Sequence, residues 1–110
     1  MSRETAYQNR ANSVRRELLI NDRPLVQIER EAVERVEVSV DEIFADSSDG
    51  TGRVEYDQGT AVVSIYPGRM GLTEGGYQCH LTIYDARAPD GIAWDRFTLV
   101  VRDWPEEINQ

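Results

Sequence analysis

The segment Gly75–Asp85 constrains the fold more than any other part of this chain. Apolar or aromatic side chains occupy alternate positions along it, at Tyr77, Cys79, Leu81 and Ile83. A period of two places these four residues on one face of an extended strand and the intervening polar residues on the other. The segment therefore predicts a sheet strand with one buried face.

The same alternation recurs at intervals of roughly ten residues, with turn-forming residues between the repeats. This spacing is typical of an all-β sandwich or small barrel, and a helix-rich fold does not fit it. The side chains expected to point inward from the further strands are Val36, Val38 and Val40; Val54 and Tyr56; Ala61, Val63 and Ile65; and Phe97, Leu99 and Val101.

Two connections are predicted from turn-forming residues. Leu18–Ile20 and Leu25–Ile28 flank the cluster Asn21–Pro24, which indicates a leading hairpin. Ala88–Gly91 contains proline, aspartate and glycine and predicts the turn before the last strand. Trp104-Pro105 is expected to end that strand.

The N-terminal segment has a different pattern. Tyr7, Ala11, Val14 and Leu18 recur at spacings of four, three and four, which is the period of one helical face. We expect an extended or helical arm over residues 1–17 that is mobile alone and becomes ordered on a neighbouring surface. A plain disordered tail is the alternative.

A length of 110 residues predicts one domain. We expect the arm at 1–17, the sandwich domain with its leading hairpin at 18–105 and a tail at 106–110. No apolar run approaches the roughly 20 residues that cross a bilayer. The polar start of the chain lacks the features of a secretory signal, so we expect synthesis in the cytoplasm and no membrane partner.

The net charge of −8 argues against direct binding to nucleic acid. Residues 1–35 carry seven arginines and six acids, however, whereas the remainder carries five arginines and fourteen acids. This asymmetry orients a molecule toward a partner. The side chains predicted to bind a partner protein are in the arm: Tyr7, Arg10, Val14, Arg15 and Arg16.

No catalytic, cofactor-binding or metal-binding set is predicted. His80 is the single histidine and Cys79 the single cysteine, and neighbours on a strand point to opposite faces, so they cannot form a nucleophile–base pair. One of each is too few for a zinc site. Asp46 and Asp49 lack the spacing of a calcium loop. Cys79 is expected to be a buried, unpaired thiol.

Tyr77, two residues before Cys79 at the start of a strand, resembles the tyrosine corner of immunoglobulin-like domains. That resemblance implies an immunoglobulin-like antiparallel β-sandwich in which the Tyr77 hydroxyl bonds to a nearby loop carbonyl. The chain departs from antibody-type domains in having Thr73 where they have aspartate, and in lacking a second cysteine.

The patterns at 33–38, 60–65, 76–85 and 97–101 are similar to those of small immunoglobulin-like structural proteins of tailed bacteriophages. The resemblance covers residues 33–101. It implies a virion protein without catalysis or cofactor, whose partners are capsid, portal or tail subunits, and it does not distinguish decoration, connector and tail roles.

Two functions follow as hypotheses. The first is an assembly protein that binds neighbouring subunits through its arm and its sheet edges, with self-association left open because edge strands invite pairing. The second is an adhesion module that binds a glycan or peptide through loops, with Trp94 and Tyr84 as candidate stacking residues.

Overall fold

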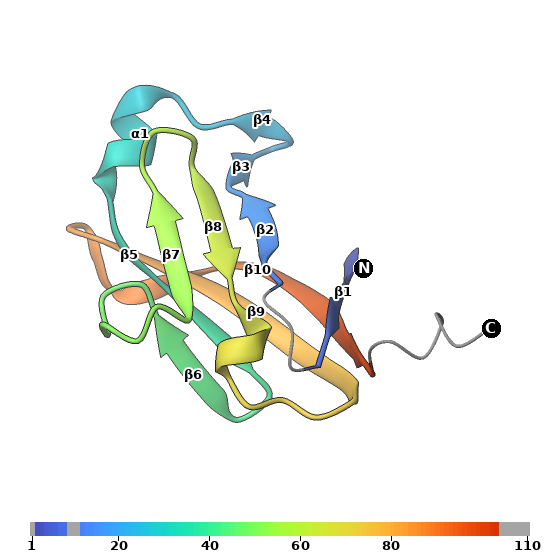
Figure 1. Ribbon diagram of the computed structural model, residues 1–110. Helices are drawn as coiled ribbons and strands as arrows, with labels where there is room; N and C mark the ends of the chain where they lie inside the picture. The colour runs from blue at the N-terminus through green and yellow to red at the C-terminus, as the bar shows by residue number, and fades with distance from the viewer. Residues whose placement is uncertain (1, 9–11, 104–110) are drawn as a thin grey trace.

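The computed structural model describes residues 2–8 and 12–103, and most of them lie in β-strands (Figure 1). The all-β class predicted from the sequence is confirmed. The elements are β1 (Ser2–Tyr7), β2 (Val14–Glu17), β3 (Leu19–Ile20), β4 (Arg23–Pro24), α1 (Gln27–Ala32), β5 (Val33–Val40), β6 (Ile43–Asp46), β7 (Val54–Asp57), β8 (Val62–Ile65), the 3-10 turn Pro67–Arg69, β9 (Gly75–Asp85) and β10 (Ala88–Arg102).

The strands form two main sheets and one short hairpin. The larger sheet has the order β1-β10-β9-β5-β6, the smaller sheet has the order β2-β8-β7, and β3 pairs with β4. Figure 1 shows the smaller sheet lying across the larger one, with the β3–β4 hairpin and α1 at one end. Buried residues of both sheets belong to one apolar cluster. The fold is therefore two-layered around a single core.

Period-two alternation accounts for the core. In β5 the valines at 36, 38 and 40 are fully buried, and β9 and β10 bury alternate residues in the same way. The remaining inward residues of the predicted strands are buried or, for Tyr56 and Tyr77, packed at the border of the core. Each large apolar side chain removed from water contributes about 1.5–3 kcal/mol, so this shared layer dominates the stability.

The N-terminal segment departs from the predicted helical or partner-bound arm. β1 runs parallel to β10, with Ser2 opposite Phe97, and β2 runs antiparallel to β8, with Val14 opposite Ile65. The prediction of a separate arm at 1–17 is wrong for the described residues, because both strands find their partners far away in the sequence. Ala11 and the 106–110 tail lie outside the described residues, as does Trp104.

The leading hairpin is shorter than predicted. Asn21 and Asp22 both have positive φ angles, 49° and 64°, which suit a two-residue hairpin turn. That turn pairs β3 with β4, so the strand predicted at Leu25–Ile28 does not form. Gln27–Ala32 is helical instead, and the Glu29 carboxylate accepts a hydrogen bond from the Val26 N–H at 2.9 Å.

Two further corrections concern connections. The turn predicted at Ala88–Gly91 is an irregular part of β10, and the chain reverses just before it. There the Asp85 carboxylate accepts hydrogen bonds from the N–H groups of Arg87 and Ala88, each at 2.9 Å. The sequence pattern also did not predict β6, a four-residue edge strand that pairs with β5.

Substitution of Gly91 tests the irregular part of β10. Gly91 has a φ of 90°, and a Cβ there would lie 2.7 Å from Thr82 Cγ2 and 2.8 Å from Tyr84 Cε1. Gly91→Ala therefore combines backbone strain with overpacking, and we expect a loss of about 2–4 kcal/mol in the free energy of unfolding.

Gly50→Ala is the matched control. Gly50 has a φ of 77°, and nothing lies within 4 Å of the position that a Cβ would take there. Gly50→Ala should lose only the contribution of backbone strain, about 1–2 kcal/mol in the free energy of unfolding. Equal urea midpoints for the two variants would contradict the predicted contact with Thr82 and Tyr84.

Candidate functional site

The outward side of β1, β10 and β9 differs in charge from the rest of the chain. Inward residues alternate with outward ones along these strands, so the outward set follows from the register. Three arginines and no carboxylate are among its described residues, on a chain whose net charge is −8. We call this surface the arginine face; its residues are Arg3, Thr5, Tyr7, Arg96, Thr98, Val100, Arg102, Gly76, Gln78 and His80.

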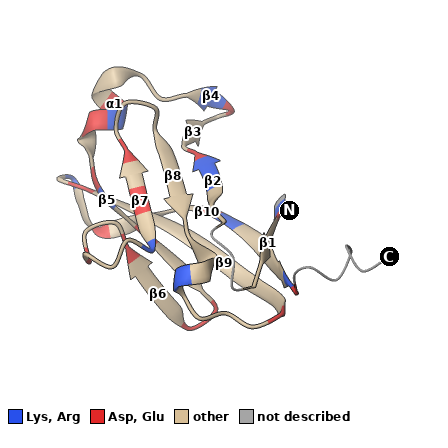
Figure 2. Ribbon diagram, in the orientation of Figure 1, with Lys and Arg blue, Asp and Glu red and all other residues tan. Residues whose placement is uncertain are grey.

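The register places the arginines of distant segments beside one another. Arg3 lies opposite Thr98, and Arg96 is two residues before Thr98 on the same side of β10. Arg96 in turn lies opposite His80 of β9. Figure 2 shows arginine positions on parts of β10 and acidic positions along β7 of the other sheet. A cationic strip therefore runs along the β1–β10 edge of the larger sheet.

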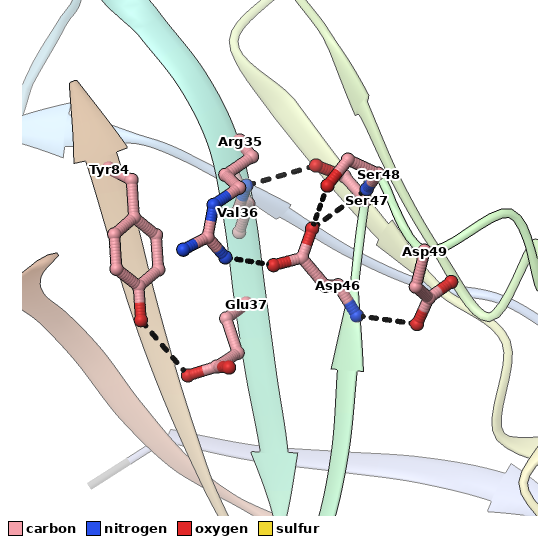
Figure 3. A network of polar contacts seen from close by, with 8 residues as sticks. All are labelled: Arg35, Val36, Glu37, Asp46, Ser47, Ser48, Asp49 and Tyr84. Carbon is pink, nitrogen blue, oxygen red and sulfur yellow. Dashed lines mark hydrogen bonds and ion pairs between the residues drawn. The ribbon is translucent and has the colours of Figure 1, made fainter. Parts of the chain in front are cut away.

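The other half of the same sheet is neutralised by contacts within the chain (Figure 3). The Arg35 guanidinium forms an ion pair with Asp46 and stacks on the Tyr84 ring, with its central carbon 3.6 Å from the ring centre. The Tyr84 hydroxyl donates to Glu37 at 3.3 Å. Arg35 is thus held by its own sheet, and this half of the sheet carries the Glu37 and Asp46 carboxylates beside its arginine.

Two carboxylates order the loop after β6. Burial opposes ionisation of Asp46, but hydrogen bonds from Ser48 and Arg35 outweigh burial and lower its pKa. Asp49 accepts bonds from the Thr51 hydroxyl at 2.6 Å and the Thr51 N–H at 2.9 Å, which lower its pKa to about 2. These oxygens satisfy local N–H and hydroxyl groups, so the loop is a structural turn.

Arg16 is a partly buried charged group at the join of the two sheets. Its guanidinium donates to Glu4 of β1 at 2.8 Å and to Asp95 of β10 at 2.6 Å, and lies 4.6 Å from the Phe97 ring centre. Burial works against its charge, but the bonds to Asp95 and Glu4 outweigh burial and raise the pKa of Arg16. Arg16 therefore links β2 to β1 and β10 of the larger sheet.

The five predicted partner-binding residues do not form one surface. Val14 is in the core, 4% exposed, and Arg16 is used within the chain, so neither presents itself to a partner. Tyr7 lies on the arginine face, and its main-chain N–H and carbonyl bond to the Asn12 side chain. Arg15 is exposed on the opposite side of the molecule. Arg10 lies outside the described residues.

The predicted structural residues lie at the other end of β9. The Tyr77 hydroxyl donates to the Thr73 carbonyl oxygen at 2.6 Å. Cys79 is 1% exposed, while the neighbouring His80 is exposed on the arginine face. Burial, aided by the charge of Asp41, raises the pKa of the Cys79 thiol to about 11. The thiol therefore stays protonated near neutral pH.

The surface hollows of the described residues differ in their lining. One of the larger hollows on them is lined mostly by polar side chains over β7 and β8, and a smaller one beside α1 is lined mostly by apolar side chains. Residues 2–8 and 12–103 contain no cluster of three or more potential metal ligands. Across the same residues, none of the helices has the length and apolar character needed to span a membrane.

Comparison with known proteins supports the fold class. No family model matches the chain, and no curated protein matches it. Among solved structures, an internalin-like protein from Listeria monocytogenes is similar, with a TM-score of 0.52 and 13% sequence identity over 93% of this chain. The match covers 27% of that protein, so the present chain spans about a quarter of its length. The likeness concerns the fold alone.

The Arg16 link is tested by Arg16→Gln, which removes both ion pairs and leaves Glu4 and Asp95 without their cation. Because these groups are only partly buried, we expect a loss of about 1–2 kcal/mol in the free energy of unfolding by urea. Arg15→Gln, on the same strand but exposed, should stay within about 0.5 kcal/mol of the wild type. Equal losses would show that Arg16 does not link the sheets.

Burial of Cys79 has a consequence for alkaline stability. Its pKa is higher in the folded chain, about 11, than the ordinary value of 9.0. The folded state therefore keeps a proton that the unfolded state loses, and this contribution to stability is present below about pH 9 and lost between about pH 9 and 11. Urea midpoints measured across this range should fall less for Cys79→Ala than for the wild type. Parallel profiles of urea midpoint against pH for the two proteins would contradict the raised pKa of Cys79.

Proposed function

We propose that this chain is an immunoglobulin-like domain that binds a neighbouring protein subunit in a larger assembly, without catalysis. The contact surface is the arginine face together with the open edge at β1. One observation carries the proposal: an acidic chain gathers three arginines and no carboxylate on one sheet face of its described residues. Arginine is enriched at protein interfaces, and its planar donors suit carboxylates.

The strand order supports the immunoglobulin-like assignment. A sheet ordered β10-β9-β5 with β6 added beside β5, facing a sheet ordered β2-β8-β7, resembles the arrangement of variable-type domains. The bond from the Tyr77 hydroxyl to the Thr73 carbonyl supports it further, since that is the contact of a tyrosine corner.

The charge of the arginine face favours an anionic partner protein. With a net charge of −8, most of the surface repels an anionic protein, and the arginine face attracts one. Docking is therefore favoured in one orientation. The edge of β1 adds main-chain groups beside the same face, where a partner strand can bond.

The assembly that we propose is the virion of a tailed bacteriophage, with capsid, portal or tail subunits as partners. Support comes from the resemblance of residues 33–101 to small immunoglobulin-like phage proteins. Repeated copies in a particle multiply contacts that are individually weak, which suits a domain with one modest cationic face. In this proposal β1 makes the N-terminal contact with the partner that was expected of the arm, since residues 2–7 are part of the sheet.

The alternative of loop-mediated glycan or peptide binding has less support. The Tyr84 ring is already stacked with Arg35 at 3.6 Å. Trp94 is partly buried against the core cluster. The stacked arginine leaves Tyr84 less available for a sugar.

Arg96→Glu tests the proposal because it reverses one charge of the arginine face at an exposed position. Wild type and variant would be expressed from the native locus, and purified particles quantified by mass spectrometry. We expect about tenfold less of the variant in particles, because a close attraction becomes a repulsion. Arg87→Glu, an equal charge change in the exposed turn after β9, should leave incorporation unchanged.

Circular dichroism and urea unfolding would establish that both variants fold. Equal incorporation of Arg96→Glu and Arg87→Glu would rule out the arginine face as the contact. Absence of the wild-type protein from particles would rule out a virion role.

A further inference from the structure

The outward side of the smaller sheet has the opposite charge to the arginine face. Its residues form two rows across β2, β8 and β7, which are Glu17–Val62–Asp57 and Arg15–Ser64–Glu55. Three acids and one arginine give this surface, the acidic face, a net charge of −2. We propose that the acidic face of one copy binds the arginine face of a second copy of this chain. The inference rests on the proposed function and names one of its partners.

The acidic face is hollowed where the second copy would bind. Arg15, Glu55, Asp57 and Ser64 line an open hollow that continues to Tyr66. The Tyr66 hydroxyl donates to Glu55 at 2.9 Å, which holds that carboxylate at the rim. Glu17 and Asp57 flank the partly buried Val62. The acidic face thus offers carboxylate oxygens at the hollow and, beside it, around the small apolar side chain of Val62.

The arginine face offers the complementary pattern. Val100 lies at its centre, opposite Thr5 on β1, with Arg102 two residues along and Arg96 four residues back on the same side. Arginine donates two parallel hydrogen bonds to a carboxylate, a geometry that is stronger than a single bond. A +3 surface and a −2 surface, each with a valine among its charges, are matched in sign and in layout.

The two faces lie on opposite outer sides of the two-layered fold, because each is the side of its sheet turned away from the shared core. A contact between them joins unlike surfaces, so a row of bound copies of any length leaves one arginine face open at one end and one acidic face open at the other. Two copies otherwise repel, since each carries −8. Association should therefore be weak, orientation-specific and strengthened by low salt.

The experiment uses two variants that each disable one face. Arg96→Glu keeps the acidic face, and Glu17→Arg keeps the arginine face. Sedimentation equilibrium of the wild type at low salt should show a mass that rises with concentration past the dimer and falls toward the monomer in high salt. Each variant alone should associate about tenfold more weakly, because Arg96→Glu lowers the charge of the arginine face from +3 to +1 and Glu17→Arg brings the acidic face from −2 to 0, which weakens the attraction between copies.

The mass of an equimolar mixture of the two variants distinguishes a contact between unlike faces from a general loss of association. The intact arginine face of Glu17→Arg binds the intact acidic face of Arg96→Glu, and the two altered faces stop growth, so the mixture should form a dimer and nothing larger. Misfolding of either variant cannot produce this result. Arg87→Glu, a charge change equal to that of Arg96→Glu but in the exposed turn after β9, should associate like the wild type.

A wild type that stays monomeric at millimolar concentration and low salt would overturn the inference. So would a mixture no heavier than its two components. If the mixture stays monomeric while Arg96→Glu is still lost from particles, the proposed function holds and the arginine face binds a different protein. If incorporation is unaffected while the mixture dimerises, the proposed particle contact fails and the contact between copies stands.

Discussion

The apolar layer between the two sheets sets the position of every surface side chain, because a strand that sends one residue inward must send the next one outward. Val36, Val38 and Val40 in β5 and the alternate residues of β9 and β10 define that layer. At the border of the apolar layer, β2 contacts β1 and β10 through the two ion pairs of Arg16 and not only through apolar side chains. The arginine face and the acidic face are the two outer sides that this packing leaves exposed.

Local pattern was sufficient to predict the central strands. The alternation in Gly75–Asp85, and that of the last strand around Phe97, identified both the strands and their buried faces. It failed where a strand is short or where its partner is remote. Val14–Glu17 pairs with β8, some fifty residues later, and its apolar residues happened to fit a helical period as well. The four residues of β6 carry too little periodicity to be recognised.

The candidate surface could not be predicted from charge along the sequence. The first 35 residues hold most of the arginines, but two of the three on the arginine face, Arg96 and Arg102, come from the acidic remainder. Only the parallel register of β1 against β10 brings Arg3 beside them. Arg16 is the opposite case. Its charge and its position near the N-terminus suggested partner binding, but its ion pairs between the sheets make it a link within the chain.

The ionic nature of the Arg16 link has a consequence for where such a domain can fold. Many two-sheet domains join their layers by a covalent sulfur bridge, which forms only under oxidising conditions. This chain has one cysteine, Cys79, buried at 1% exposure, and joins β2 to β10 by charge instead. No disulfide within the chain is therefore needed to hold the two sheets together, and folding does not depend on an oxidising medium.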